Sequence, residues 1–241
     1  MLIHTDPIPN GPYTDVVVLV DVLRTCTVAP MLFDQGIAAL ALTPSLRRAR
    51  AARDAGHLLV GERQGVPPEG FHHGNSPALL ADADVAGRSV VMVSENAPRW
   101  LEQVARARHV LLASLVNAGA VAERAASVAR ERVDLVGSGF SGEPDLDDTL
   151  AAGLIAGLLQ ARLPSARPSG ATRFAMGLLR ALPDPLDALW NSTAGHYLRA
   201  IGLEQDLAVS ARVSVLDVVP ELTSVEQGDP APLYHFAPAA G

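Results

Sequence analysis

Apolar and polar positions alternate along the chain in blocks that predict strands followed by helices. The clearest block is Val16–Val20, where five apolar residues run without interruption. A run of this kind is typical of a strand covered on both faces, as in a parallel sheet. Shorter apolar runs predict further strands at residues 37–42, 57–60, 89–93, 109–113, 133–136 and 213–218.

Helix signals fill the segments between these runs. A helix is expected from Arg24 to Gln35, because Gly36 suits a helix C-terminus. Thr43 and Pro44 predict the start of an arginine-rich outer helix. Ser76 and Pro77 can cap a short helix, and longer helices are expected to end near residue 106 and to span residues 114–132, 149–162, 172–182 and 192–201.

This order of elements predicts an α/β fold of three layers, in which a mostly parallel or mixed sheet carries helices on both faces. Residues 1–241 are expected to form a single domain. Residues 1–14 contain three prolines and predict an irregular lead-in, and residues 221–241 predict a loose, proline-rich tail.

Composition and charge narrow the classes of function. The formal net charge of −7 argues against nonspecific binding of nucleic acid. No apolar run approaches the roughly 18 residues that a membrane span needs. The N-terminus lacks the pattern of a signal peptide, and Cys26 is the only cysteine, so a cytoplasmic protein without internal disulfides is expected. A homodimer is among the expected assemblies.

The chain contains no lysine, and all 19 basic residues are arginine. This excludes a Schiff-base enzyme and a phosphate-binding loop that depends on lysine. Any site for an anion must therefore use arginine, backbone N–H groups or a metal ion.

Polar groups follow several of the predicted strands directly. Ligands of open α/β sheets bind beyond the carboxyl ends of the strands, so these groups are expected to face a common cleft. They are Asp21 and Arg24, Glu62 and Arg63, Asn96 and Arg99, Ser114 and Asn117, and the segment from Ser138 to Asp148.

These candidates separate by chemistry. Carboxylates suit a hard cation such as Mg²⁺, and the candidates are Asp21, Glu62, Asp147 and Asp148. Guanidinium groups suit phosphate, carboxylate or sulfonate, and the candidates are Arg24, Arg63 and Arg99. Together they predict metal-assisted chemistry on a small anionic substrate.

Structural interpretations of the same residues stay open. Asp21 can cap a helix, Glu62 and Arg63 can form a surface ion pair, and acids at 147–148 can favour a helix N-terminus through its dipole. The long loop at residues 61–77 also holds His72 and His73, which are candidates for a metal ligand or an acid–base group.

Taken in order, several motifs resemble the ComB-type 2-phosphosulfolactate phosphatases. They are VDVLRTCT, GER, GFHHGNSP, Asn96 with Arg99, SLVNA, GSG with LDD, and the late GHYLRAIGLEQDLAVSARVSVLDVVP. The resemblance implies an α/β hydrolase that uses Mg²⁺ to release phosphate from (R)-2-phospho-3-sulfolactate, on the route to coenzyme M.

The resemblance also implies roles for individual residues. It implies that Asp21, Arg24, Glu62 and Arg63 are catalytic, and that Asp21, Glu62, Asp147 and Asp148 are metal ligands. The implied substrate-binding residues are Arg99, Asn75, Ser76, Asn96, Ser114, Asn117, Ser138 and Gly139.

Three positions depart from the family pattern. His72 stands where the family has aspartate, Cys26 where it has threonine, and the turn at residues 95–98 reads Glu-Asn-Ala-Pro instead of Thr-Asn-Gly-Thr. Three hypotheses follow: a Mg²⁺-dependent phosphatase, a non-catalytic anion-binding relative, and a different hydrolase that uses His72 or His73.

Overall fold

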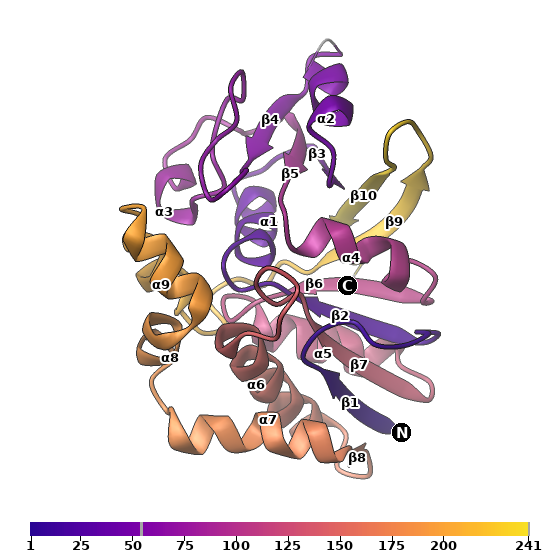
Figure 1. Ribbon diagram of the computed structural model, residues 1–241. Helices are drawn as coiled ribbons and strands as arrows, with labels where there is room; N and C mark the ends of the chain where they lie inside the picture. Colours follow the sequence, from indigo (N-terminus) through magenta and orange to yellow (C-terminus); the bar gives the residue numbers. More distant parts are fainter. Residues whose placement is uncertain (54, 241) are drawn as a thin grey trace.

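The computed structural model describes residues 1–53 and 55–240, and Figure 1 shows how their helices and strands are arranged. The strands are β1 (Leu2–Asp6), β2 (Val16–Val20), β3 (Ala39–Thr43), β4 (Leu58–Gly61), β5 (Ser89–Val93), β6 (His109–Ala113), β7 (Arg132–Gly137), β8 (Arg167–Pro168), β9 (Pro220–Glu226) and β10 (Leu233–Pro238). The helices are α1 (Thr25–Asp34), α2 (Leu46–Arg53), α3 (Pro77–Leu80), α4 (Ala97–Val104), α5 (Ala118–Val128), α6 (Leu146–Arg162), α7 (Gly170–Ala181), α8 (Pro185–Asn191), α9 (Thr193–Ala200) and α10 (Gln205–Ser210).

The strands form one sheet in the order β4-β5-β3-β10-β9-β6-β2-β7-β1-β8. One parallel set contains β3, β4 and β5, and the other contains β1, β2, β6, β7 and β8. The antiparallel hairpin β9–β10 joins them by pairing with β6 on one side and with β3 on the other. The predicted three-layer α/β class with a mostly parallel, mixed sheet is confirmed.

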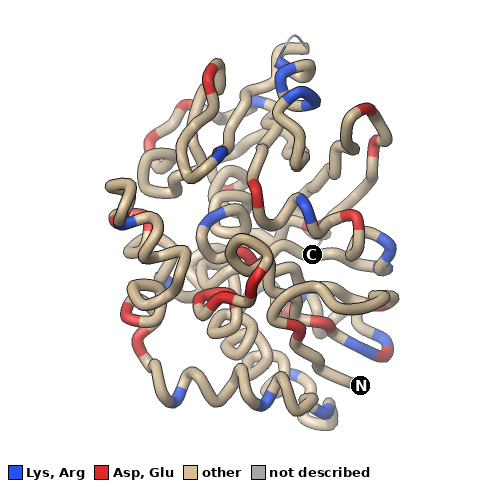
Figure 2. The backbone as a smooth tube through the Cα atoms, in the orientation of Figure 1, with Lys and Arg blue, Asp and Glu red and all other residues tan. Residues whose placement is uncertain are grey.

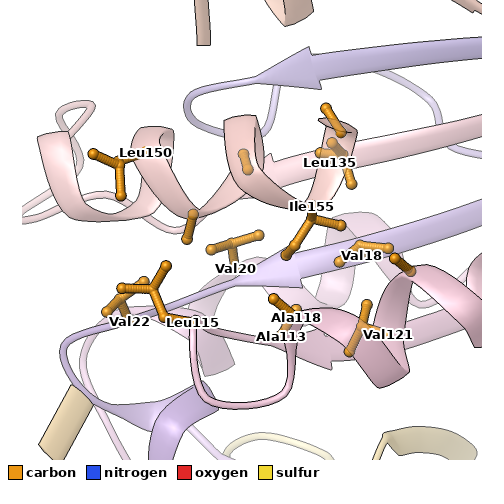
Figure 3. Packing of buried hydrophobic residues seen from close by; sticks show 14 of the residues in the cluster. Val18, Val20, Val22, Ala113, Leu115, Ala118, Val121, Leu135, Leu150 and Ile155 are labelled. Carbon is orange, nitrogen blue, oxygen red and sulfur yellow. The ribbon is translucent and has the colours of Figure 1, made fainter. Parts of the chain in front are cut away.

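Strand β2 lies at the centre of the core, and each of its five residues is buried. Successive side chains of β2 point to opposite faces of the sheet, and both faces are covered, as the unbroken apolar run predicts. Val18 and Val20 pack with residues of α5 and α6, as Figure 3 shows, whereas Val17 and Leu19 belong to a second cluster with α1 and α4. Burial of each valine contributes about 1.5–3 kcal/mol to folding.

The expectations for the two ends of the chain are wrong in part. Within the predicted irregular lead-in, β1 pairs in parallel with β7. Within the predicted loose tail, β10 pairs with both β9 and β3 at the middle of the sheet. Prolines do not prevent this pairing because Pro220 begins β9 and Pro238 ends β10, and proline is tolerated at such positions.

The strand predicted at residues 213–218 is absent from the described structure. This segment is a loop whose backbone N–H groups at Ser214, Val215 and Leu216 donate to the carbonyls of Leu115 and Val116. The backbone of this segment therefore pairs with another loop, and the side chains of Val213 and Val215 stay exposed. The helix predicted at residues 114–132 begins only at Ala118, because the preceding residues form this contact.

The C-terminal ends of β2 and β5 meet, although four strands separate them in the sheet order. The backbone N–H of Ala97 donates to Asp21 Oδ2 (3.0 Å), and the Thr25 hydroxyl donates to the Ser94 hydroxyl (2.9 Å). Twist of about 20–25° between neighbouring strands accumulates over this interval and turns the two parallel sets toward each other. None of the helices within residues 1–53 and 55–240 has the length and apolar character needed to cross a membrane.

Candidate active site

A cavity of about 480 Å³ opens where these strand ends meet. Its walls come from the segments that follow β2, β3, β4, β5 and β7, and from helix α9. Figure 2 shows acidic and basic positions close together in this central region of the backbone. The lining residues include Arg24, Glu62, Arg63, Asn75, Asn96 and Arg99, all of which the sequence predicts as site residues, together with Gln64, Glu95 and Tyr197.

Glu62 is fixed at the wall of this cavity by the end of β4. Gly61 has φ 145°, and a Cβ atom there would lie 2.2 Å from the carbonyl oxygen of Val93, so only glycine lets β4 approach β5 this closely. The Glu62 carboxylate accepts hydrogen bonds from the backbone N–H groups of Glu95 (2.8 Å) and Gly65 (2.9 Å). Of the four predicted acids, Glu62 alone lines the cavity.

Arg24 lines the cavity from a buried position, following a cis peptide bond from Leu23. Its Nη1 lies 2.9 Å from Asp206 Oδ2, and its Nη2 donates to the carbonyl oxygen of Gly65 at 2.8 Å. The other oxygen of Asp206 accepts a hydrogen bond from the Ser76 hydroxyl. Sequence reasoning missed Asp206, and predicted Ser76 as a substrate ligand, whereas its hydroxyl here binds Asp206.

The other two arginines are more accessible. Arg63 donates to the carbonyl oxygen of Pro44, and its Nη1 lies 3.7 Å from Glu95 Oε1. The Arg99 guanidinium lies 4.7 Å from the centre of the Trp100 ring, within range of a cation–π interaction. Both arginines therefore present N–H groups to a ligand in the cavity.

Asn75 supplies a further polar group. Its side chain lines the cavity and is 2% exposed, yet Oδ1 finds no hydrogen-bond partner among the described residues. A buried amide without a partner costs free energy, on the order of 1–3 kcal/mol. Because Oδ1 is an acceptor, only a water molecule or a ligand group with an O–H or N–H removes this cost.

Asp21 lies behind the cavity wall and is 1% exposed. Its two oxygens accept from the backbone N–H groups of Thr25 and Ala97, both at 3.0 Å, so it joins the N-termini of α1 and α4. Burial raises the pKa of Asp21, and the nearby Glu62 charge raises it further. The helix-capping interpretation of Asp21 is therefore supported, together with its predicted proximity to Glu62.

Asp148 is also buried and bound by backbone groups. It accepts from the backbone N–H groups of Val22, Ser138 and Gly139 and from the Ser138 hydroxyl. Burial and the charge of Asp21 raise the pKa of Asp148 to about 7. In this structure Ser138 and Gly139 bind Asp148, and neither lines the cavity.

Asp147 differs from Asp148 because its Oδ1 atom has no hydrogen-bond partner among the described residues. Burial raises the pKa of Asp147 well above its usual range, and the charges of Asp148 and Asp145 add to the shift. Asp147 is buried and does not line the cavity.

Ser114 and Asn117 form a separate polar cluster. Asn117 Oδ1 accepts from the backbone N–H of Ser114, and its Nδ2 donates to the carbonyls of Leu112 and Val218. These contacts connect β6 to the loop before β9. Neither residue lines the cavity, although both were predicted to bind substrate.

His72 also lies outside the cavity lining. Its Nδ1 accepts a hydrogen bond from the backbone N–H of Leu59 at 2.9 Å. Burial and the nearby Arg53 charge lower the pKa of His72. In this structure His72 therefore makes a contact with the backbone of β4.

The structure places only one of the four predicted metal ligands where it could bind a divalent cation in the cavity. Only Glu62 of the four predicted metal ligands lines the cavity, and no cluster of three or more His, Cys, Asp or Glu side chains suited to a metal occurs in the described part of the chain. Mg²⁺ commonly needs only one or two carboxylates, because water and substrate phosphate complete its shell. Glu62 suits that arrangement because it lines the cavity, whereas both oxygens of Asp21 are bound by backbone N–H groups behind the wall.

Comparison with known proteins identifies the class. The sequence model of the 2-phosphosulpholactate phosphatase family matches residues 3–225. The chain therefore belongs to this family of phosphoric monoester hydrolases.

Individual relatives agree with this assignment. A protein of Thermus thermophilus is 42% identical over 225 residues, which are 92% of this chain and 94% of that protein. A protein of Deinococcus radiodurans is 40% identical over 235 residues, which are 96% of each chain. A protein of Synechococcus sp. (strain RCC307) is 35% identical over 225 residues, 89% of this chain and 92% of its own. All three are named probable 2-phosphosulfolactate phosphatase.

Proposed function

We propose that this protein hydrolyses (R)-2-phospho-3-sulfolactate, or a closely related small 2-phospho acid, to the hydroxy acid and phosphate. The observation that supports this most strongly is one cavity lined by Arg24, Arg63 and Arg99. The proposed substrate carries phosphate, carboxylate and sulfonate groups. Arginines bind such groups through two parallel hydrogen bonds, so the donors in the cavity match the acceptors of the ligand.

The residues of the cavity have distinct proposed roles. Arg24 is held by Asp206 and is oriented before substrate arrives, so it binds the phosphoryl oxygens where charge develops. Arg99 and Asn75 orient the remaining polar groups of the substrate. Glu62, as the acid that lines the cavity, is placed to accept a proton from attacking water.

We also propose that Mg²⁺ is required, with Glu62 as the residue that would hold it. A bound Mg²⁺ would neutralise part of the charge of the phosphoryl group. The cavity has three arginines and two glutamates, and Asp206 already pairs with Arg24, so the protein supplies little net positive charge for a substrate with three anionic groups.

Phosphate release tests this proposal. Purified protein with Mg²⁺ is expected to release phosphate from 2-phosphosulfolactate, and EDTA is expected to stop the reaction. Arg63→Gln is expected to lower kcat/KM by about 100-fold, whereas Arg130→Gln, on an exposed arginine outside the cavity lining, leaves it unchanged. The proposal is contradicted if the protein releases phosphate from none of several 2-phospho acids.

A second candidate is an anion-binding relative without hydrolysis. The observation that favours it is Glu95, whose carboxylate lies beside Arg63 and reduces the positive charge of the cavity. In that case sulfolactate raises the Tm of the protein while no ester is cleaved.

A further inference from the structure

The turn at residues 63–66 presents two consecutive backbone N–H groups to carboxylates. Arg63 and Val66 exchange backbone hydrogen bonds across the turn. Gln64 (φ 51°) and Gly65 (φ 75°) both adopt left-handed conformations. As a result, the N–H of Gly65 donates to Glu62 Oε2 and the N–H of Gln64 donates to Glu95 Oε2, each at 2.9 Å. Consecutive N–H groups in such turns form concave sites for anions.

Contacts from other elements hold this turn in place. The Tyr197 hydroxyl of α9 donates to the carbonyl oxygen of Gln64 at 2.9 Å, and Arg24 donates to the carbonyl oxygen of Gly65. A Cβ atom at position 65 would lie 2.5 Å from Ile201 Cδ1, so the turn also packs closely against the end of α9. The two N–H groups therefore keep their direction whether or not a carboxylate is bound.

The two carboxylates on this turn are held differently. Glu62 is 8% exposed, and both of its oxygens accept backbone hydrogen bonds. The side chain of Glu95 is 45% exposed, and its second oxygen lies 3.7 Å from Arg63 Nη1. An exposed ion pair of this length contributes little, about 0–1 kcal/mol. Glu62 is therefore a fixed part of the wall, whereas an incoming anion can replace Glu95.

We propose that the Gln64 N–H and the Arg63 guanidinium form an anion subsite for the second anionic group of the substrate, and that Glu95 occupies this subsite until substrate replaces it. This inference rests on the proposed function, because it assigns the sulfonate or carboxylate of that substrate to the subsite. Glu95 is thereby a specificity-determining residue. Its carboxylate competes with substrates that carry an extra anionic group and does not compete with phosphate alone.

Calorimetric titration of the whole protein with sulfolactate, lactate and inorganic phosphate tests the subsite without requiring turnover. Glu95→Gln removes the competing charge, and Glu95→Ala removes the whole carboxylate. Both variants are expected to bind sulfolactate about fivefold to tenfold more tightly than the wild type. Their affinity for inorganic phosphate is expected to stay within about twofold. A parallel gain for lactate assigns the subsite to the carboxylate, and no gain for lactate assigns it to the sulfonate.

Glu102→Gln is the matched control, because this exposed glutamate of α4 lies outside the cavity lining and undergoes the same chemical change. The inference is overturned if the Glu95 variants bind sulfolactate no better than Glu102→Gln, if they bind phosphate equally better, or if no variant binds sulfolactate. Weaker binding by Glu95→Gln also overturns it, since Glu95 would then support the ligand. A gain in affinity without any hydrolysis by the wild type defeats the proposed function alone, and hydrolysis without that gain defeats the subsite alone.

Discussion

Strand β2 has an aspartate beyond each end, and the pKa values of the two carboxyls shift in opposite directions. Before the strand, burial alone would raise the pKa of Asp15, but N–H donors from Arg132, Glu131 and Arg130, together with Arg108, hold it well below its usual range. After the strand, burial of Asp21 outweighs its two backbone donors, and the Glu62 charge adds to the rise.

This difference distinguishes Asp15, a carboxylate with a structural role, from Asp21 and Glu62, which lie at or behind the wall of the cavity. At the first end, one acid meets several N–H donors and a guanidinium, so its charge is neutralised within the fold. At the second end, the repulsion between Asp21 and Glu62 persists next to the cavity. Raised pKa values beside a cavity are typical of a functional site, where a ligand or cation supplies the missing interactions.

The largest effect is expected for Glu62→Gln at the second end. The glutamine oxygen can still accept one backbone hydrogen bond, but the charge and the proton-accepting group are lost. We expect kcat to fall by about 100-fold or more, equivalent to about 2.7 kcal/mol in the barrier. Stability should fall by about 1–3 kcal/mol, because one of the two backbone N–H groups loses its acceptor. Steady-state kinetics and urea unfolding measure both, and a kcat close to the wild type would remove Glu62 from the reaction.

Asp15→Asn at the first end is expected to act only on stability. It removes a charge that accepts three backbone N–H groups and pairs with Arg108 at 2.6 Å. Hydrogen bonds to charged groups contribute about 1.5–3 kcal/mol each, so we expect a loss of about 2–3 kcal/mol near neutral pH with kcat/KM unchanged. A large loss of activity in a stable variant would contradict the separation of the two ends.

The pH dependence of the same variant sharpens this test. The folded-state pKa of Asp15 is lower than its unfolded value, so the unfolded state binds more protons and this stabilisation is lost as pH falls. The stability difference between wild type and Asp15→Asn should therefore be full above about pH 5 and should shrink toward about pH 3. A difference that stays constant across this range would show that the charge of Asp15 is not what stabilises the fold.

Asn117→Ala tests whether a polar residue that follows a parallel strand necessarily takes part in substrate binding. The variant loses contacts to Ser114, Leu112 and Val218, and we expect a cost of about 1–2 kcal/mol. The value of kcat/KM should stay within about twofold of the wild type. A selective rise in KM without loss of stability would place Asn117 in substrate binding after all.

The smallest effect is expected for His72→Asn. The asparagine oxygen can accept the Leu59 N–H in place of Nδ1. Stability should change by about 0.5 kcal/mol or less, and kcat should be unchanged. A marked fall in kcat would instead support the hypothesis of a histidine-dependent hydrolase.

The location of the site could be predicted because the residues that follow parallel strands lie at the same edge of the sheet, beyond the C-terminal ends of the strands. Asp21, Glu62, Arg63 and Arg99 stand close to such ends, and an apolar run identifies each strand. The role of each residue could not be predicted, because it depends on which backbone groups happen to face it. Asp148 and Asn117 bind the N–H and carbonyl groups of segments that no local pattern places beside them.

The fold features that the sequence did not predict also depend on contacts between segments far apart in the chain. Strands β9 and β10 complete the sheet between two parallel sets, although prolines near them suggested a loose tail. Helix α10 is only Gln205–Ser210, too short for a periodic pattern, yet it carries Asp206 to Arg24. A buried ion pair between positions 182 residues apart leaves no local signal in the sequence.

A crystal structure with sulfolactate and Mg²⁺ tests most directly whether the cavity is the active site. We expect the ligand to contact Arg63, Arg99 and Asn75, with the metal ion beside Glu62. Sulfolactate bound at another surface, or a cavity that stays empty at saturating ligand, would contradict that assignment.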